Sequence, residues 1–192
     1  MISANSVNMV IPIGQALPIT LLPYEPAFLQ PFIQWRSQPL SLRHNPLKRM
    51  STEEIAAMLQ AEGSRLSDLR QHESYRWFIA IEGQVVGSVS LKNISHSMGY
   101  GEIGYGIAAA HHRKGIGAAA VRLLVDKIFS ESPLRKLIAY VHEENQASRR
   151  LLEKLGFQEE GLLREHYLIN GIPVNEIFYG LLKRNFLWPI KK

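Results

Sequence analysis

The stretch His111-His112-Arg113-Lys114-Gly115-Ile116-Gly117 is the part of the chain from which the fold can be predicted. It lies between a strand-like segment, 100–107, and a segment of helical periodicity, 118–130. Its two glycines lack Cβ atoms, so the backbone can turn sharply and point several N–H groups at one ligand where a helix begins. Its arginine and lysine add positive charge beside the positive end of the helix dipole. The stretch is therefore predicted to bind a pyrophosphate.

Spacing excludes two other phosphate-binding loops. A Walker loop ends in Gly-Lys-Ser/Thr, whereas here Lys114 precedes Gly115 and neither serine nor threonine follows directly. The segment Gly104-Tyr105-Gly106-Ile107-Ala108-Ala109 does match a dinucleotide-binding fingerprint with alanine at its third position. Its glycines, however, fall inside the predicted strand, before the helix begins. We interpret this second match as accidental.

The composition is that of one globular domain. The chain has 192 residues, of which 46% are hydrophobic and 20% are charged. It contains no cysteine, which excludes disulfides and a cysteine nucleophile, and the cytoplasm is the expected compartment. The first 20 residues do not resemble a signal peptide, and no apolar run reaches the roughly 20 residues that span a bilayer, so no membrane is expected. A net charge of +5 suits an anionic cofactor. The sequence contains no basic run interleaved with aromatic residues, so direct binding of nucleic acid is not expected.

Outward from the loop, hydrophobic periodicity predicts an alternation of strands and helices. Glu82-Gly83 and Asn170-Gly171 are turn signals that predict two hairpins, and Pro39 and Pro46 are expected to bracket a loop. An irregular arm is predicted at 1–19, a single domain at 20–188 and a tail at 189–192. Strands are predicted at 20–24, 77–81, 85–91, 100–107, 137–141, 162–169 and 172–182. Helices are predicted around 28–35, after a cap at Ser51, at 118–130, and from Asn145 to Leu155.

A second group of residues, downstream of the loop, points to a family. The chain carries Asn145-Gln146-Ala147-Ser148 and then Lys154-Leu155-Gly156-Phe157-Gln158-Glu159-Glu160-Gly161. Together with Gly104-Tyr105 and the loop at 112–117, these residues resemble the GCN5-related N-acetyltransferase (GNAT) family over roughly residues 20–188. Further stretches are similar to the branch that acetylates the N-termini of ribosomal proteins: Trp35-Arg36-Ser37, Glu160-Gly161-Leu162-Leu163-Arg164 and Asn170-Gly171.

The resemblance implies an α/β (α+β) fold. Its mixed, mostly antiparallel twisted sheet would have about seven strands, flanked by helices and splayed between 100–107 and 137–141, with acetyl-CoA in the opening. Backbone groups of Ile107, Ala108 and Ala109 would pair with the pantetheine arm. His112 departs from the Gln or Arg usual in the family, a change that the neighbouring arginine can compensate. The pyrophosphate would be held by the backbone of His112, Arg113, Lys114, Gly115, Ile116, Gly117 and Ala118.

The resemblance also implies that the acceptor amine attacks the thioester directly, in a ternary complex. Asn145 would bind the cofactor arm or an ordered water, and Ser148, one turn later, would donate a proton to the sulfur. Glu102 is the candidate base, acting directly or through water. Tyr167 is a third candidate catalytic residue, at a position where the related branch can carry a carboxylate, so Glu102 or Glu165 would replace that group.

Plainer roles remain open for several of these residues. Asn145 and Ser148 can simply cap a helix, Glu102 can be a solvated strand residue, and Tyr105 can be core or pocket wall. His111 and His112 lack metal-ligand spacing, and no metal is expected.

The predicted function is acetyl-CoA-dependent transfer of an acetyl group to a primary amine, with a protein or peptide N-terminus, such as that of a ribosomal protein, as the preferred acceptor. One alternative is a small amine: a polyamine, an aminoglycoside or an amino acid. Another is a CoA-binding module with weak catalysis. The expected partners are acetyl-CoA and the amine acceptor, with the chain a monomer or a homodimer.

Overall fold

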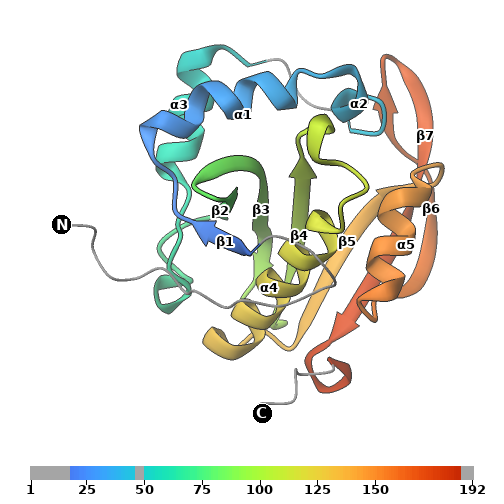
Figure 1. The fold of residues 1–192 in the computed structure, drawn as a ribbon. Helices are drawn as coiled ribbons and strands as arrows, with labels where there is room; N and C mark the ends of the chain where they lie inside the picture. Colours follow the sequence, from blue (N-terminus) through green and yellow to red (C-terminus); the bar gives the residue numbers. More distant parts are fainter. Residues whose placement is uncertain (1–17, 46–49, 187–192) are drawn as a thin grey trace.

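A computed structural model of the protein describes residues 18–45 and 50–186. The predicted arm, except for its last two residues, and the predicted tail lie outside the described residues. Within them, one sheet runs in the order β1-β2-β3-β4-β5-β7-β6, and its neighbours are antiparallel except for β4 and β5 (Figure 1). The strands are β1 Ile19–Leu22, β2 Tyr75–Ile81, β3 Gln84–Ser95, β4 Tyr100–Ile107, β5 Lys136–His142, β6 Gln158–Ile169 and β7 Ile172–Leu182.

Helices cover both faces of this sheet. We call the face that carries Ile103 and Tyr105 of β4 the α4 face, because its side chains share one core with α4 and α5. The opposite face carries Phe78 and Glu102, and we call it the α1 face because Phe78 packs with residues of α1 and α3. In Figure 1, α1, α2 and α3 lie at the top, while α4 crosses in front of the strands. The helices are α1 Leu29–Arg36, α2 Pro39–Leu42, α3 Thr52–Ala61, α4 Ile116–Glu131 and α5 Gln146–Lys154, with short 3-10 turns at Pro26–Phe28, Leu66–Asp68, Ala109–His111 and Lys183–Asn185.

The predicted seven-stranded mixed sheet is confirmed, and the differences are local. The expected loop after Pro39 begins instead with the short helix α2, since proline at the first helical position costs no hydrogen bond. Strand β6 begins at Gln158 rather than at Leu162, because Gln158 and Glu159 already pair with Gly180 and Tyr179 of β7. Helix α4 begins at Ile116, two residues earlier than predicted.

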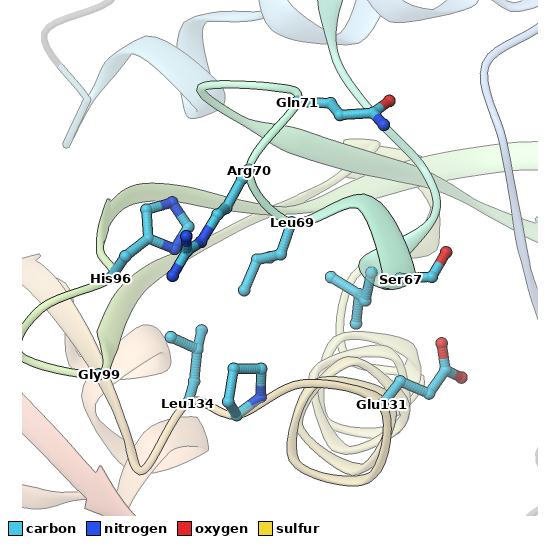
Figure 2. A pocket seen from close by; sticks show the side chains of 10 residues that line it. Ser67, Leu69, Arg70, Gln71, His96, Gly99, Glu131 and Leu134 are labelled. Atoms are coloured by element: carbon cyan, nitrogen blue, oxygen red, sulfur yellow. The ribbon is translucent and has the colours of Figure 1, made fainter.

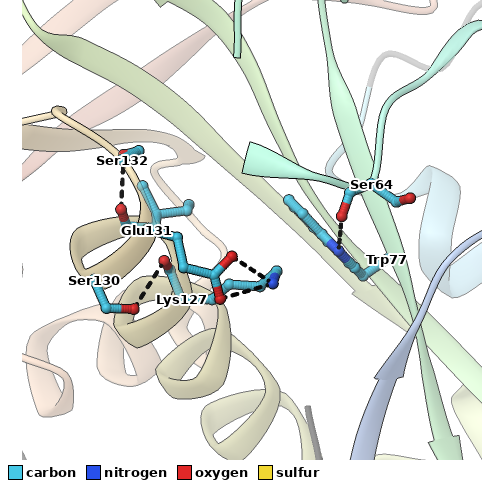
Figure 3. Close-up of polar contacts among 7 residues, drawn as sticks. Ser64, Trp77, Lys127, Ser130, Glu131 and Ser132 are labelled. Carbon is cyan, nitrogen blue, oxygen red and sulfur yellow. Dashed lines mark hydrogen bonds and ion pairs between the residues drawn. The ribbon is translucent and has the colours of Figure 1, made fainter. Parts of the chain in front are cut away.

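Polar contacts hold the end of α4 and the start of the sheet (Figure 3). Lys127 forms an ion pair with Glu131 one turn later at 2.8 Å, and the Ser132 hydroxyl donates to the carbonyl of Ile128 at 2.7 Å. The indole N–H of the buried Trp77 donates to the carbonyl of Ser64 at 3.0 Å. The Ser132 bond satisfies one carbonyl in the last turn of the helix, and the Ser64 carbonyl satisfies the one polar atom of a core aromatic side chain.

The two parallel strands separate along their length. β4 and β5 pair only through Tyr100↔Lys136, Gly101↔Leu137 and Glu102↔Ile138. Beyond Glu102, β4 continues to Ile107 and β5 to His142, so the backbones diverge toward the carboxyl ends of both strands. The predicted opening between these strands is therefore confirmed.

Candidate active site

The predicted phosphate loop connects the diverging end of β4 to α4. Arg113 and Gly115 have φ values of 61° and 76°, and Gly115 is the N-cap residue of the helix. No side chain caps this end of α4, and its first backbone hydrogen bond runs from Ala119 to the Gly115 carbonyl. The N–H groups of the first turn therefore point outward, beside a loop exposed from His112 to Gly115. This geometry suits an anion.

The backbone between β4 and the loop already holds partners. The Ala108 N–H donates to the carbonyl of Val86 at 2.8 Å, within the sheet. The Ala109 N–H donates to Oε1 of Gln38 at 3.2 Å, and Nε2 of His112 lies 2.8 Å from the carbonyl oxygen of Ile107. The side chain of His112 thus folds back toward β4. The side chains of Gln38 and His112 thus contact the Ala109 N–H and the Ile107 carbonyl, two backbone groups that were expected to pair with a pantetheine arm.

The helix α5 carries the predicted proton donor. Asn145 caps this helix, because its Oδ1 accepts the Ser148 N–H at 3.1 Å. The Ser148 hydroxyl lies 2.5 Å from the phenol oxygen of Tyr105, on the α4 face of β4 beyond its last pair with β5. Burial raises the pKa of Tyr105 to about 12, although its hydrogen bond to Ser148 opposes the shift. Tyr105 is therefore protonated at neutral pH and can orient the Ser148 hydroxyl.

Glu102 is a buried residue with partners, not a solvated strand residue. Its residue surface is only 7% exposed, and it is the last residue of β4 to pair with β5, on the α1 face. Its Oε1 lies 2.9 Å from the Lys92 ammonium, and its Oε2 accepts from the Asn93 amide at 2.6 Å. Both carboxylate oxygens are thus engaged at the edge of the opening.

The remaining candidates lie on β6. The Tyr167 hydroxyl donates to the carbonyl of His44 at 3.1 Å, which ties β6 to the segment after α2. Burial, with a smaller effect from Glu176, raises the pKa of Tyr167 to about 12, so this phenol is a donor rather than a base at neutral pH. Glu165 is exposed, with φ at 48° in an irregular part of β6.

Three residues near the opening were missed as site residues from sequence. Tyr105 had a usable signal, because strand alternation puts it on the same face as the helices after β4. Gln38 had none, since its contact with Ala109 joins residues 71 positions apart. His166 also had none, because an irregularity in β6 decides its direction.

Two hollows on the surface lie away from the candidate site residues. One of about 410 Å³ is formed by the segment 66–71, the turn before β4 and the end of α4, and Figure 2 shows Arg70 beside His96 at this place. None of the candidate site residues lines it. In residues 18–45 and 50–186, no group of three or more His, Cys, Asp or Glu side chains could hold a metal ion. No helix of the described part is long and apolar enough to cross a membrane.

Comparison of sequences finds relatives that are N-acetyltransferases. Residues 19–158 match the family model described as an acetyltransferase (GNAT) domain. An uncharacterized N-acetyltransferase YoaA of Bacillus subtilis is 31% identical over 144 residues, 73% of this chain and 80% of the relative. The putative ribosomal N-acetyltransferase YdaF of the same organism is 36% identical over 55% of the chain and 57% of the relative, so the chain spans little more than half of that protein. Spermidine N(1)-acetyltransferase of Escherichia coli K12 is 30% identical over 66% of this chain and 69% of the relative.

Solved structures share the fold. Mycobacterium smegmatis RimJ, in complex with CoA-disulfide, superposes with a TM-score of 0.76 at 23% identity, covering 86% of this chain and 82% of that one. Spermidine N-acetyltransferase of Vibrio cholerae, in complex with CoA and spermine, superposes with a TM-score of 0.77 at 22% identity, covering 87% of this chain and 96% of that one. The diverging strands, the loop before α4 and the extent of the sequence match lead to one conclusion: the chain belongs to the GNAT family of N-acetyltransferases, which use acetyl-CoA.

Proposed function

We propose that this GNAT enzyme acetylates the α-amine of a protein or peptide. The observation that carries the proposal is the opening between β4 and β5. The N-terminal end of α4, which suits an anion, follows β4 at this opening, and the Ser148–Tyr105 pair lies beside it. Acetyl-CoA in this opening would have its thioester near Ser148 and its pyrophosphate at α4. The cytoplasm, expected from the lack of cysteine, and a monomer or homodimer are part of the same proposal.

The cofactor would be held mainly by backbone groups. Amides of 112–118 would bind the pyrophosphate, with Arg113 and Lys114 adding charge, and Ile107 to Ala109 would pair with the pantetheine arm. For that pairing the side chains of Gln38 and His112 must move off the Ala109 N–H and the Ile107 carbonyl. Binding of acetyl-CoA would therefore exchange two internal hydrogen bonds for two to the cofactor.

Ser148 is the proposed proton donor to the departing sulfur. Its amide is fixed by Asn145 and its hydroxyl by the neutral phenol of Tyr105, so the hydroxyl is held in one direction. Glu102 is proposed to place negative charge at the edge of the opening. Because both of its oxygens already hold partners, it is better suited to attract an ammonium group than to accept a proton.

A polyamine is the second candidate acceptor, since a spermidine acetyltransferase is among the relatives. A polycation needs several unpaired carboxylates along its length. The carboxylate at the edge of the opening on the α1 face, Glu102, is a single group that already pairs with Lys92. This pairing favours an acceptor with one charged amine.

Mass spectrometry of a substrate panel tests the proposal. Peptides that begin with alanine or serine, spermidine, spermine, an aminoglycoside and free amino acids would each be incubated with acetyl-CoA and enzyme. Acetylation of peptide N-termini is expected, whereas exclusive acetylation of polyamines would overturn the acceptor class. Binding of acetyl-CoA without any product would favour a binding module.

Variants then test the chemistry. Ser148→Ala is expected to lower kcat by about 100-fold, the usual contribution of a general acid. Ser130→Ala is the matched control, because Ser130 is exposed on α4 and donates only to its own helix at the Lys127 carbonyl. If Ser148→Ala and Ser130→Ala have the same kcat, Ser148 is not the proton donor.

A further inference from the structure

An irregularity in β6 brings two adjacent side chains to the same face of the sheet. The register between β6 and β7 shifts between Leu163 and Tyr167, where Glu165 has a φ of 48°. In a regular strand, consecutive side chains point to opposite faces. Here the ring of His166 lies 5.6 Å from that of Tyr140, and the ring of Tyr167 lies 6.5 Å from that of His142. Both contacts are with alternate residues of β5, on the α1 face.

His166 is held there by a carboxylate. Its Nδ1 lies 2.6 Å from Oε2 of Glu176 on β7. The Glu176 side chain is 14% exposed, whereas the His166 side chain is 47% exposed. A carboxylate that accepts the Nδ1–H bond selects the tautomer in which Nε2 carries the lone pair. The pair is thus a half-exposed imidazole with a largely buried orienting carboxylate.

The pair lies beside the opening between β4 and β5. The last paired residues there are Glu102 and Ile138, and the next residue of β5 on the same face is Tyr140. Burial, and then the nearby carboxylates of Glu102 and Glu176, raise the pKa of Tyr140. The Tyr140 ring therefore lies within electrostatic reach of both carboxylates and in contact with the imidazole of His166.

We propose that His166 is the catalytic base of the acetyl transfer and that Glu176 is its positioning residue; this inference rests on the proposed function. Nε2 of His166 takes a proton from the amine nitrogen as the bond from that nitrogen to the acetyl carbon forms. The C–S bond breaks, its electron pair leaves with the sulfur, and the sulfur takes a proton from Ser148. Water then removes the proton from His166 and restores that of Ser148.

Other groups near His166 are less suited to this role. Tyr140 and Tyr167 are phenols whose pKa values are raised, so both are protonated at neutral pH. Glu102 has both oxygens engaged, and Glu176 is the partner of His166 itself. The titratable groups around the imidazole include Glu176 on β7, Tyr140 on β5 with Glu102 of β4 beyond it, and Arg164, Glu165 and Tyr167 on its own strand. His142 of β5 lies opposite Glu176 on the same face, but it is buried and its Nδ1 already accepts the N–H of Glu144 at 3.0 Å.

Steady-state kinetics with the best acceptor of the panel tests the assignment. His166→Gln is expected to lower kcat by about 100-fold and to leave the KM for acetyl-CoA unchanged. His96→Gln is the matched control, because His96 is exposed in the turn before β4, at the end of that strand away from the opening. Glu176→Gln keeps a hydrogen-bond acceptor but removes the charge, and a loss of about tenfold is expected.

Two readouts separate catalysis from a structural role. The kcat/KM of the unmodified enzyme should fall more steeply toward acidic pH than that of His166→Gln, because in the variant only the acceptor amine is left to take up a proton. Added imidazole should raise the rate of His166→Ala, whereas it should leave His96→Ala unchanged. An equally steep fall of kcat/KM in His166→Gln, or no rescue of His166→Ala, would overturn the assignment.

The outcomes also distinguish the two proposals. An unmodified enzyme that acetylates no amine overturns the proposed function and this inference with it. Full activity of His166→Gln on an amine that the unmodified enzyme acetylates overturns the role of His166 alone.

Discussion

Replacing Tyr105 with phenylalanine removes one oxygen atom from the centre of the site. The lost hydrogen bond joins the Tyr105 phenol to the Ser148 hydroxyl at 2.5 Å. A bond of this kind contributes about 0.5–1.5 kcal/mol to the free energy of unfolding. Ser148 is only partly buried, so water can replace the lost partner, and we expect a cost of about 1 kcal/mol, or about 2–4 °C in Tm. Misdirection of the Ser148 hydroxyl by a similar energy would lower kcat about fivefold.

A double-mutant cycle isolates this contact. Unfolding by urea and kcat would be measured for Tyr105→Phe, Ser148→Ala and the double variant. Tyr24→Phe is the control, because the Tyr24 ring packs on Phe78, on the α1 face and away from Ser148. If Tyr105 acts through Ser148, its substitution should have little further effect once Ser148 is alanine. Equal losses of kcat in both backgrounds would refute the reasoning.

The stability of Tyr105→Phe should also depend on pH differently from that of the unmodified protein. Burial raises the pKa of Tyr105 from 10.0 to about 12. The unfolded chain therefore loses this phenol proton first, and the contribution of Tyr105 to stability, complete below about pH 10, is lost as pH rises through about 12. The loss amounts to up to about 2.7 kcal/mol. Tyr105→Phe should lose less stability than the unmodified protein over this interval, and an identical loss would contradict the assignment.

Other substitutions test the cofactor site and the core. Gln38→Ala should tighten acetyl-CoA binding about two- to tenfold in calorimetry, because the cofactor no longer displaces Gln38 from the Ala109 N–H, while Gln34→Ala, on the exposed side of α1, should change nothing. Arg113→Ala should weaken binding at low salt, with a smaller effect in about 1 M NaCl because salt screens exposed charges; a loss that is independent of salt would contradict an ionic role. Leu152→Ala, in the fully buried core under α5, should cost about 2–5 kcal/mol of unfolding free energy, and a cost below about 1 kcal/mol would show that the core there is loosely packed.

The order of the elements could be predicted because each has a local cause. The alternation of apolar residues predicted β2 and β3, the cap at Ser51 predicted the start of α3, and the phosphate loop placed the start of α4 to within two residues. The errors fall where the local signal is weak. Strand β6 is an exposed edge, so its alternation is too faint to place its first residue.

Contacts between distant residues escaped prediction. Gln38 reaches Ala109 and Tyr167 reaches the carbonyl of His44, pairs that are 71 and 123 residues apart. Burial of Glu102 among Lys92 and Asn93 depends on how β3 and β4 pair, not on its own neighbours in sequence. Such contacts follow from chain folding, and their partners cannot be chosen from one segment alone.

The sequence by itself determined the family, the phosphate loop and the capped helix that carries Ser148, because glycine conformation, helix capping and hydrophobic period act over a few residues. Tertiary structure decided what surrounds these residues: that Tyr105 meets Ser148, that Glu102 is fully engaged, and that His166 stands with Glu176 beside the opening. The last of these depends on the irregularity in β6, which reverses the direction that alternation alone would assign. Acid and base chemistry depends on distances between side chains, and only packing sets those distances.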